Sequence, residues 1–211
     1  MRWLAAVLIL AAGSVLAQGF DHSHRAWDGL VKKHVVLIAG NNASQVRYVE
    51  FAKDRAALKT YLDALSGVPA AEFRAWTRNQ QMAFLINAYN AFTVELILAH
   101  YPVKSIKDIG SDLFSNRWKK KFFMLLGRES YLDQIEHEIL RKPGSYNEPR
   151  VHFAVNCASI GCPMLREEAY VAERLEAQME EQAQRFLSDR TRNRLGADGR
   201  LEASNIFHRF K

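Results

Sequence analysis

The sequence predicts an α+β fold, a mainly helical single domain around a central apolar helix with a few short antiparallel strands. Two observations lead to this prediction. The stretch from Met82 to Ala99 is apolar on nearly every face, which is typical of a helix at the centre of a fold. Several other segments repeat apolar residues at helical spacing, and turn signals separate short strand-like runs.

The composition is that of a globular protein. The chain has 211 residues, of which 48% are hydrophobic and 25% charged, and its formal net charge is +6. These values exclude a disordered chain, a collagen and a low-complexity array. Two cysteines exclude a disulfide-dense small protein and a zinc module with several cysteines. We therefore expect one domain over residues 18–211, large enough to form a core unaided.

Residues 1–17 are predicted to be a secretory signal peptide. Arg2 precedes a short apolar run, and Val15 and Ala17 occupy the positions that a signal peptidase reads. The run is shorter than the roughly 20 residues that a membrane-spanning helix needs. We expect an exported protein, periplasmic or secreted, with no stable membrane insertion after cleavage. Its cysteines would then meet an oxidising compartment.

Helical periodicity predicts most of the remaining chain. The predicted helices cover residues 20–36, 54–65, 78–100, 132–141 and 167–187. Thr77 is a suitable cap for the central helix, and Tyr101-Pro102 ends it. Asp133 opens the short helix that follows.

Short strands and turns are predicted between the helices. Residues 46–49 and 151–155 have the pattern of strands, and residues 122–132 predict a hairpin with its turn at Gly127-Arg128. Asp198-Gly199 predicts a second hairpin near the end of the chain.

The densest polar cluster in an apolar setting lies at residues 150–163. On a strand, His152 and Asn156 would share a face, and Cys157 would begin the loop that follows. A cysteine becomes a nucleophile when a base or a cation lowers the pKa of its thiol. His152 is one candidate base, and an asparagine would orient its ring.

His137 is the second candidate base. It lies between Glu136 and Glu138, with Asp133 one helical turn earlier. An aspartate four residues before a histidine raises the pKa of the histidine and fixes its ring. The alternative is a solvated face of the helix.

Asn87 and Asn90 are three residues apart on the otherwise apolar central helix, so they face the same side. An unpaired buried amide costs roughly 1–3 kcal/mol, so both must have partners. They either join the central helix to a loop, or they line a pocket. In a pocket they would orient His137 or His152 or donate to an oxyanion.

The cysteines also allow two other interpretations. Cys157 and Cys162 are five residues apart in a chain expected to be exported, which favours a disulfide at least as strongly. If it forms, neither sulfur is a resting nucleophile. A metal site formed by both cysteines with His152 and His137 is disfavoured, because the spacing matches no standard zinc motif. No phosphate loop, dinucleotide fingerprint or haem motif occurs, so no cofactor is expected.

Nucleic acid is not an expected partner. Lys119, Lys120 and Lys121 precede two phenylalanines, a pattern also found on nucleic-acid-binding surfaces. A charge run beside a strand is more often a solvated edge, and an exported protein rarely meets nucleic acid. The expected partner is a small-molecule or envelope substrate, and the positive charge favours contact with an anionic surface.

The chain resembles domain-of-unknown-function family 547. The most specific motif is HFAVNCASIGCP, which begins at His152. The matching stretches are residues 20–31, 83–93, 101–110, 132–141, 149–165 and 186–194. The resemblance implies an exported α+β domain with no established reaction. Its motif residues here are Asn87, Asn90, His137, His152, Asn156, Cys157 and Cys162.

Two positions depart from the family pattern. Arg47 stands where related chains carry an acidic residue before Tyr48. The chain also ends soon after Ile206-Phe207, where related chains continue past a similar motif. We expect either a short protein or a missing C-terminal extension that would complete the site.

Two hypotheses of function follow. The first is a cysteine-dependent hydrolase or acyl transferase with Cys157 as nucleophile and His152 or His137 as base. The asparagines would orient the base or bind the oxyanion. The second is a non-catalytic envelope binding module with a Cys157–Cys162 disulfide, which predicts a closed polar cluster with no cleft above it.

Overall fold

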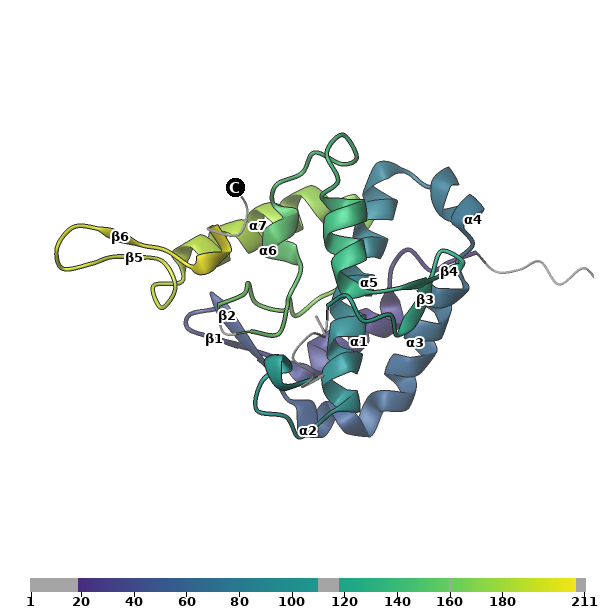
Figure 1. The fold of residues 1–211 in the computed structure, drawn as a ribbon, viewed down its shortest axis with the longest axis horizontal. Coiled ribbons are helices and arrows are strands. Elements are labelled where there is room, and N and C mark those ends of the chain that lie inside the picture. The colour runs from purple at the N-terminus through teal and green to yellow at the C-terminus, as the bar shows by residue number, and fades with distance from the viewer. Residues whose placement is uncertain (1–18, 110–117, 160, 208–211) are drawn as a thin grey trace, which may run out of the picture.

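One buried helix, α5 (Arg78–Ala99), lies at the centre of the molecule (Figure 1). The computed structural model describes residues 19–109, 118–159 and 161–207. Every residue of α5 from Met82 to Leu98 is buried except Glu95. By length and composition alone α5 is a candidate membrane span, but 89% of its most apolar window is buried within the protein. It is therefore the core helix that the sequence predicts.

The start of α5 is fixed by a reciprocal cap. Thr77 Oγ1 accepts a hydrogen bond from the Gln80 N–H at 3.3 Å, and Gln80 Oε1 accepts one from the Thr77 N–H at 3.0 Å. These bonds satisfy backbone donors that a helix start otherwise leaves unpaired. The helix ends at Ala99, before Tyr101-Pro102, as predicted.

Amphipathic helices cover α5 on both sides (Figure 1). The larger ones are α1 (Arg25–His34), α3 (Arg55–Gly67), α4 (Ala70–Ala75) and α7 (Leu175–Ser188). In α3, for example, Leu58, Leu62 and Leu65 are buried, and each buried leucine contributes about 1.5–3 kcal/mol. Short helical turns join them: α2 (Tyr48–Phe51), η1 (Ala52–Asp54), η2 (Ile106–Asp108) and η4 (Ala172–Arg174).

The described strands form three separate antiparallel hairpins, which confirms the predicted α+β class. They are β1 (Val35–Ile38) with β2 (Ala43–Val46), β3 (Phe123–Leu125) with β4 (Arg128–Ser130), and β5 (Arg194–Leu195) with β6 (Leu201–Glu202). The predicted hairpins at 122–132 and around Asp198-Gly199 are confirmed. The β5–β6 hairpin reaches away from the rest of the molecule, at the left of Figure 1.

Two predicted strands are wrong. Residues 151–155 form the short helix α6 (Val151–Ala154), because burial of Val151, Ala154 and Val155 also fits one helical turn. A run of five residues is too short to distinguish the helical period of about 3.6 residues from the strand period of two. The strand predicted at 46–49 ends at Val46, and Tyr48 begins α2.

The predicted helix over 167–187 begins later than expected, at Leu175. The backbone before it is bound by side chains instead of by helical hydrogen bonds. Asn87 bonds both the N–H and the C=O of Tyr170, and Gln178 Nε2 donates to the Ala169 carbonyl at 2.8 Å. These bonds hold the segment extended.

His24 is a buried histidine packed beneath α3. Its side chain is 1% exposed, and its Nδ1 lies 2.7 Å from the Tyr61 hydroxyl. Burial, with a smaller effect of His22, lowers the pKa of His24 to about 3. The ring is therefore neutral at neutral pH.

We predict that His24 makes the protein less stable as the pH falls. The pKa is about 3 in the folded state, against 6.5 as its ordinary value, so the unfolded state binds more protons between these values. One such site changes the free energy of unfolding by about 1.4 kcal/mol per pH unit. The free energy of unfolding, measured by urea unfolding at several pH values, should fall less steeply with decreasing pH in His24→Asn than in wild type. Asparagine also tolerates the positive φ of this position, so equal slopes would refute the prediction.

Candidate functional site

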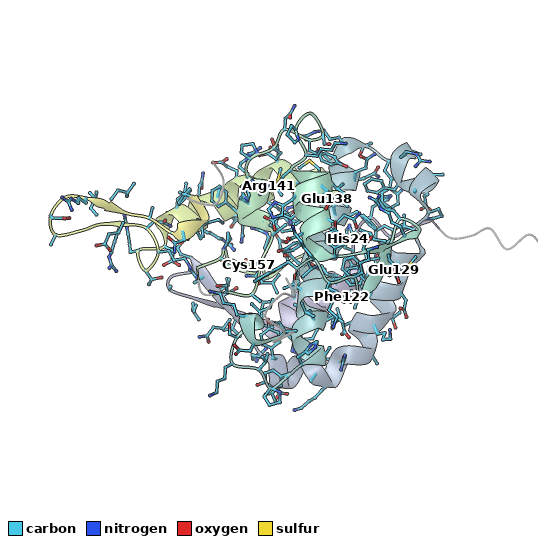
Figure 2. All side chains as sticks on the ribbon, in the orientation of Figure 1. His24, Phe122, Glu129, Glu138, Arg141 and Cys157 are labelled. Carbon is cyan, nitrogen blue, oxygen red and sulfur yellow. A yellow bond between two sulfur atoms is a disulfide. The ribbon has the colours of Figure 1, made fainter. Side chains whose placement is uncertain are left out.

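A cavity of about 680 Å³ lies between α5, the π-helix η3 (Gln134–Leu140) and the loop that follows α6. Its walls carry titratable side chains and both cysteines. Among them are Tyr89, Lys107, Asp133, Glu136, His137, His152, Cys157 and Cys162. Figure 2 labels Cys157 on the loop and Arg141 at the end of η3. The cavity thus unites both histidines predicted as bases with the predicted nucleophile.

The π-helical geometry of η3 decides which side chains meet. The Arg141 N–H donates to the Glu136 carbonyl at 2.9 Å, a bond across five residues. This places Arg141 above Glu136, with Nη1 3.8 Å from Oε1. The same guanidinium donates to Nδ1 of His137 at 2.9 Å. Arg141, and not the predicted Asp133, is the residue that hydrogen-bonds His137.

Glu136 is the carboxylate at the centre of this group. The residue is 8% exposed. Its Oε1 lies 3.7 Å from Nδ1 of His152, and its Oε2 lies 4.0 Å from Nε2 of His137. Burial raises the pKa of Glu136, while the neighbouring His137 and Arg141 act in the opposite direction.

Tyr89 brings a hydroxyl from α5 to the same carboxylate. The residue is fully buried, and its hydroxyl interacts with Glu136. Burial, followed by the charge of Glu136, raises the pKa of Tyr89 well above its ordinary value. The phenol therefore keeps its proton and serves only as a neutral polar neighbour of the carboxylate.

His152 lies on α6 and lines the cavity beside Glu136. Burial, assisted by the nearby Arg141 and His137, lowers the pKa of His152 to about 3. Its Nδ1 faces the Glu136 carboxylate at 3.7 Å, a neighbour that favours the neutral tautomer with the proton on Nδ1. This is the protonation state that a general base requires.

The two cysteines are joined. Cys157 and Cys162 form a disulfide with their Cα atoms 6.1 Å apart, as the second interpretation of the sequence expects. In this state neither sulfur is a nucleophile. Among the described residues, those of the cavity included, no group of three or more histidine, cysteine or acidic side chains is arranged to hold a metal ion.

The predicted asparagines are bound to backbone. Asn87 Nδ2 donates to the Tyr170 carbonyl at 2.7 Å, and its Oδ1 accepts from the Tyr170 N–H at 3.0 Å. Asn90 Nδ2 donates to the Ala154 carbonyl at 3.0 Å, and its Oδ1 accepts from the Asn156 N–H at 2.8 Å. Both amides join the central helix to neighbouring segments, and neither is bonded to an imidazole.

Asn156 shapes the disulfide loop. Its Nδ2 donates to the Pro163 carbonyl at 2.6 Å, and its Oδ1 accepts from the Ala158 N–H at 3.0 Å. These bonds join the two ends of the loop that carries Cys157. Asn156 therefore positions the cysteine and does not itself line the cavity.

The sequence did not indicate Glu136, Tyr89 or Arg141 as members of the site. Glu136 directly precedes His137 in the sequence. Adjacent residues of an α-helix point in different directions, so the spacing did not predict that both side chains would line one cavity. Tyr89 lies between Asn87 and Asn90, so its place beside two polar residues was the one available signal.

Residues 73–187 match a family described as "Protein of unknown function, DUF547". The chain belongs to the DUF547 family. No curated protein and no solved structure matches the chain. The DUF547 region contains α5, η3, α6 and the disulfide loop, and with them every titratable side chain named above for the cavity.

We predict different effects for two matched amide deletions. Asn87→Ala and Asn90→Ala each remove a buried amide with two backbone partners, so each should lower the free energy of unfolding by about 1–3 kcal/mol. Only Asn90→Ala releases the Asn156 N–H at the start of the disulfide loop. It alone should speed reduction of the disulfide by a dithiol. Equal reduction rates for the two variants would contradict this role of Asn90.

Proposed function

We propose that this DUF547 domain is a cysteine-dependent hydrolase or acyl transferase that acts in its reduced form, with Cys157 as nucleophile and His152 as base. One observation carries the proposal. Cys157 and His152 line the same cavity, and the buried Glu136 carboxylate lies 3.7 Å from His152 Nδ1. A sulfur, an imidazole and an orienting carboxylate are the parts that thiol acyl transfer needs.

His152 is favoured over His137 as the base. Both ring nitrogens of His137 have neighbours in η3, Arg141 at Nδ1 and Glu136 near Nε2. His137 is also about half exposed. His152 lines the cavity with Cys157 and has its Nδ1 toward the buried Glu136 carboxylate, which would orient the ring as a base.

The proposed reaction begins when an external dithiol reduces the disulfide to two thiols and is itself oxidised. His152 Nε2 then takes the Cys157 proton as the sulfur attacks an acyl carbon, which forms a thioester and expels the leaving group with that proton. Water, or a second acceptor, attacks the thioester and restores the thiol. Lys107 lines the cavity and offers a positive charge for the oxyanion.

The low pKa of His152 is compatible with this role. Burial is the main cause of the lowered pKa in the resting site, and the nearby Arg141 and His137 lower it further. Negative charge that develops on the sulfur or the oxyanion would raise the pKa of the imidazole. The proposal therefore implies a thiol that stays protonated at rest and loses its proton during attack.

The second candidate function is a binding module, and the disulfide favours it. That hypothesis predicts a closed cluster with no cleft, whereas a cavity of about 680 Å³ is lined by both cysteines. We therefore keep it as the alternative. The binding module would be supported if the disulfide resists reduction and the reduced protein shows no acyl transfer.

We also propose that the protein acts outside the cytoplasm, in the periplasm or as a secreted protein. The support is the signal-like sequence of residues 1–17, which lies outside the described residues, and the disulfide, which suits an oxidising compartment. A small molecule or an envelope component would be the substrate.

We predict that acyl transfer from p-nitrophenyl acetate depends on His152. In a Cys162→Ser background Cys157 is a permanent thiol, and stopped-flow release of p-nitrophenol should show a burst. Adding His152→Asn should slow the burst about a hundredfold, the usual lower range for a lost general base. His137→Asn is the matched control and should change the rate little. Equal rates for the two histidine variants, or a burst that survives Cys157→Ser, would overturn the proposal.

A further inference from the structure

The last described segment of the chain forms part of the wall of the site. Asn205 and Ile206, in the short helix η5 (Asn205–Phe207), line the cavity that contains Cys157 and His152. Ile206 and Phe207 also line a second cavity of about 520 Å³, and His152 is among its other lining residues. Ile206 and His152 thus line both cavities.

This segment is held by few interactions. The Ser204 hydroxyl donates to the Gly161 carbonyl in the disulfide loop at 2.9 Å, and the Ser204 N–H donates to Asn193 Oδ1 at 3.2 Å. The Phe207 ring lies 6.3 Å from that of Phe153 and 6.0 Å from that of Phe186.

The β5–β6 hairpin that leads to the segment adds little support. Leu195 and Leu201 are cross-strand partners in it, and they are 71% and 72% exposed. Phe207 itself is 42% exposed. An element with so few buried contacts opens at low free-energy cost.

We propose that residues 204–207 occupy a peptide-binding cleft that joins the two cavities, and that the ligand of this cleft is a peptide with an aromatic side chain. The segment shows what the cleft accepts. The Ser204 hydroxyl bonds the disulfide loop, and the Ser204 backbone N–H bonds the Asn193 side chain. Ile206 lines both cavities together with His152, and the Phe207 ring lies near those of Phe153 and Phe186. This inference rests on the proposed function only where it makes that peptide the substrate.

The chain's own segment would compete with such a peptide. A tethered segment acts at an effective concentration of the order of millimolar, so the wild-type cleft should be largely self-occupied. Ser204→Ala with Phe207→Ala removes the hydroxyl bond and the aromatic anchor in the full chain. Both positions are partly exposed, which limits the effect on folding.

The test measures binding of a fluorescent peptide, Ala-Ser-Asn-Ile-Phe-His (residues 203–208), by polarisation. The double variant should bind it at least tenfold more tightly than wild type, and a peptide with alanine in place of phenylalanine should bind at least tenfold more weakly. Leu201→Ala is the control, since its exposed side chain lies in the same hairpin. It should behave as wild type.

Binding is measured on the oxidised protein, where no acyl transfer is expected, so a failure here is distinct from a failure of the proposed function. Equal affinity of wild type and double variant would overturn the inference. So would equal binding of the alanine peptide, or equal competition by octanamide, which would show a cleft for any apolar chain. If the double variant unfolds, Ser204→Ala alone is compared with wild type. It should bind the peptide at least threefold more tightly, and equal affinity would again overturn the inference.

Discussion

Buried polar groups on α5 must find partners without water, and this requirement positions the site. Asn87 bonds the carbonyl and the N–H of Tyr170. Asn90 bonds the Ala154 carbonyl and the Asn156 N–H. An unsatisfied amide there would cost more than a typical surface interaction contributes. The two bonded pairs therefore fix the segment before α7 and the start of the disulfide loop relative to the central helix.

The site is built outward from that frame. Asn90 holds Asn156, which closes the loop of Cys157, while Tyr89 on the same helix reaches the Glu136 carboxylate. Glu136 in turn lies between the imidazoles of His152 and His137. A helix that is structural along most of its length thus also supplies a polar group to the cavity. The reduction of the disulfide is the step that would turn this arrangement into a reactive one.

The sequence predicted the fold better than the site. The all-round apolar pattern of α5 and its Thr77 cap required a central helix, and both are confirmed. Four-residue segments such as α6 carry too few side chains to separate helical from strand periods. The π-helical register of η3 depends on tertiary packing, so Glu136 could not be assigned to the cavity from spacing alone. His137, His152 and Cys157 line one cavity, but the disulfide leaves Cys157 without a free thiol at rest.

The measurement that tests the central claim most directly is nitrogen NMR of histidine-labelled protein, with His152→Asn used to assign the signal. The claim is that burial, together with the nearby Arg141 and His137, keeps His152 neutral, and that the ring carries its proton on Nδ1, toward the Glu136 carboxylate. We expect a pKa of about 3, so the ring should stay in the Nδ1–H form throughout the acidic range in which the protein is folded. A ring that titrates near 6.5, its ordinary value, or that carries its proton on Nε2, would contradict the claim.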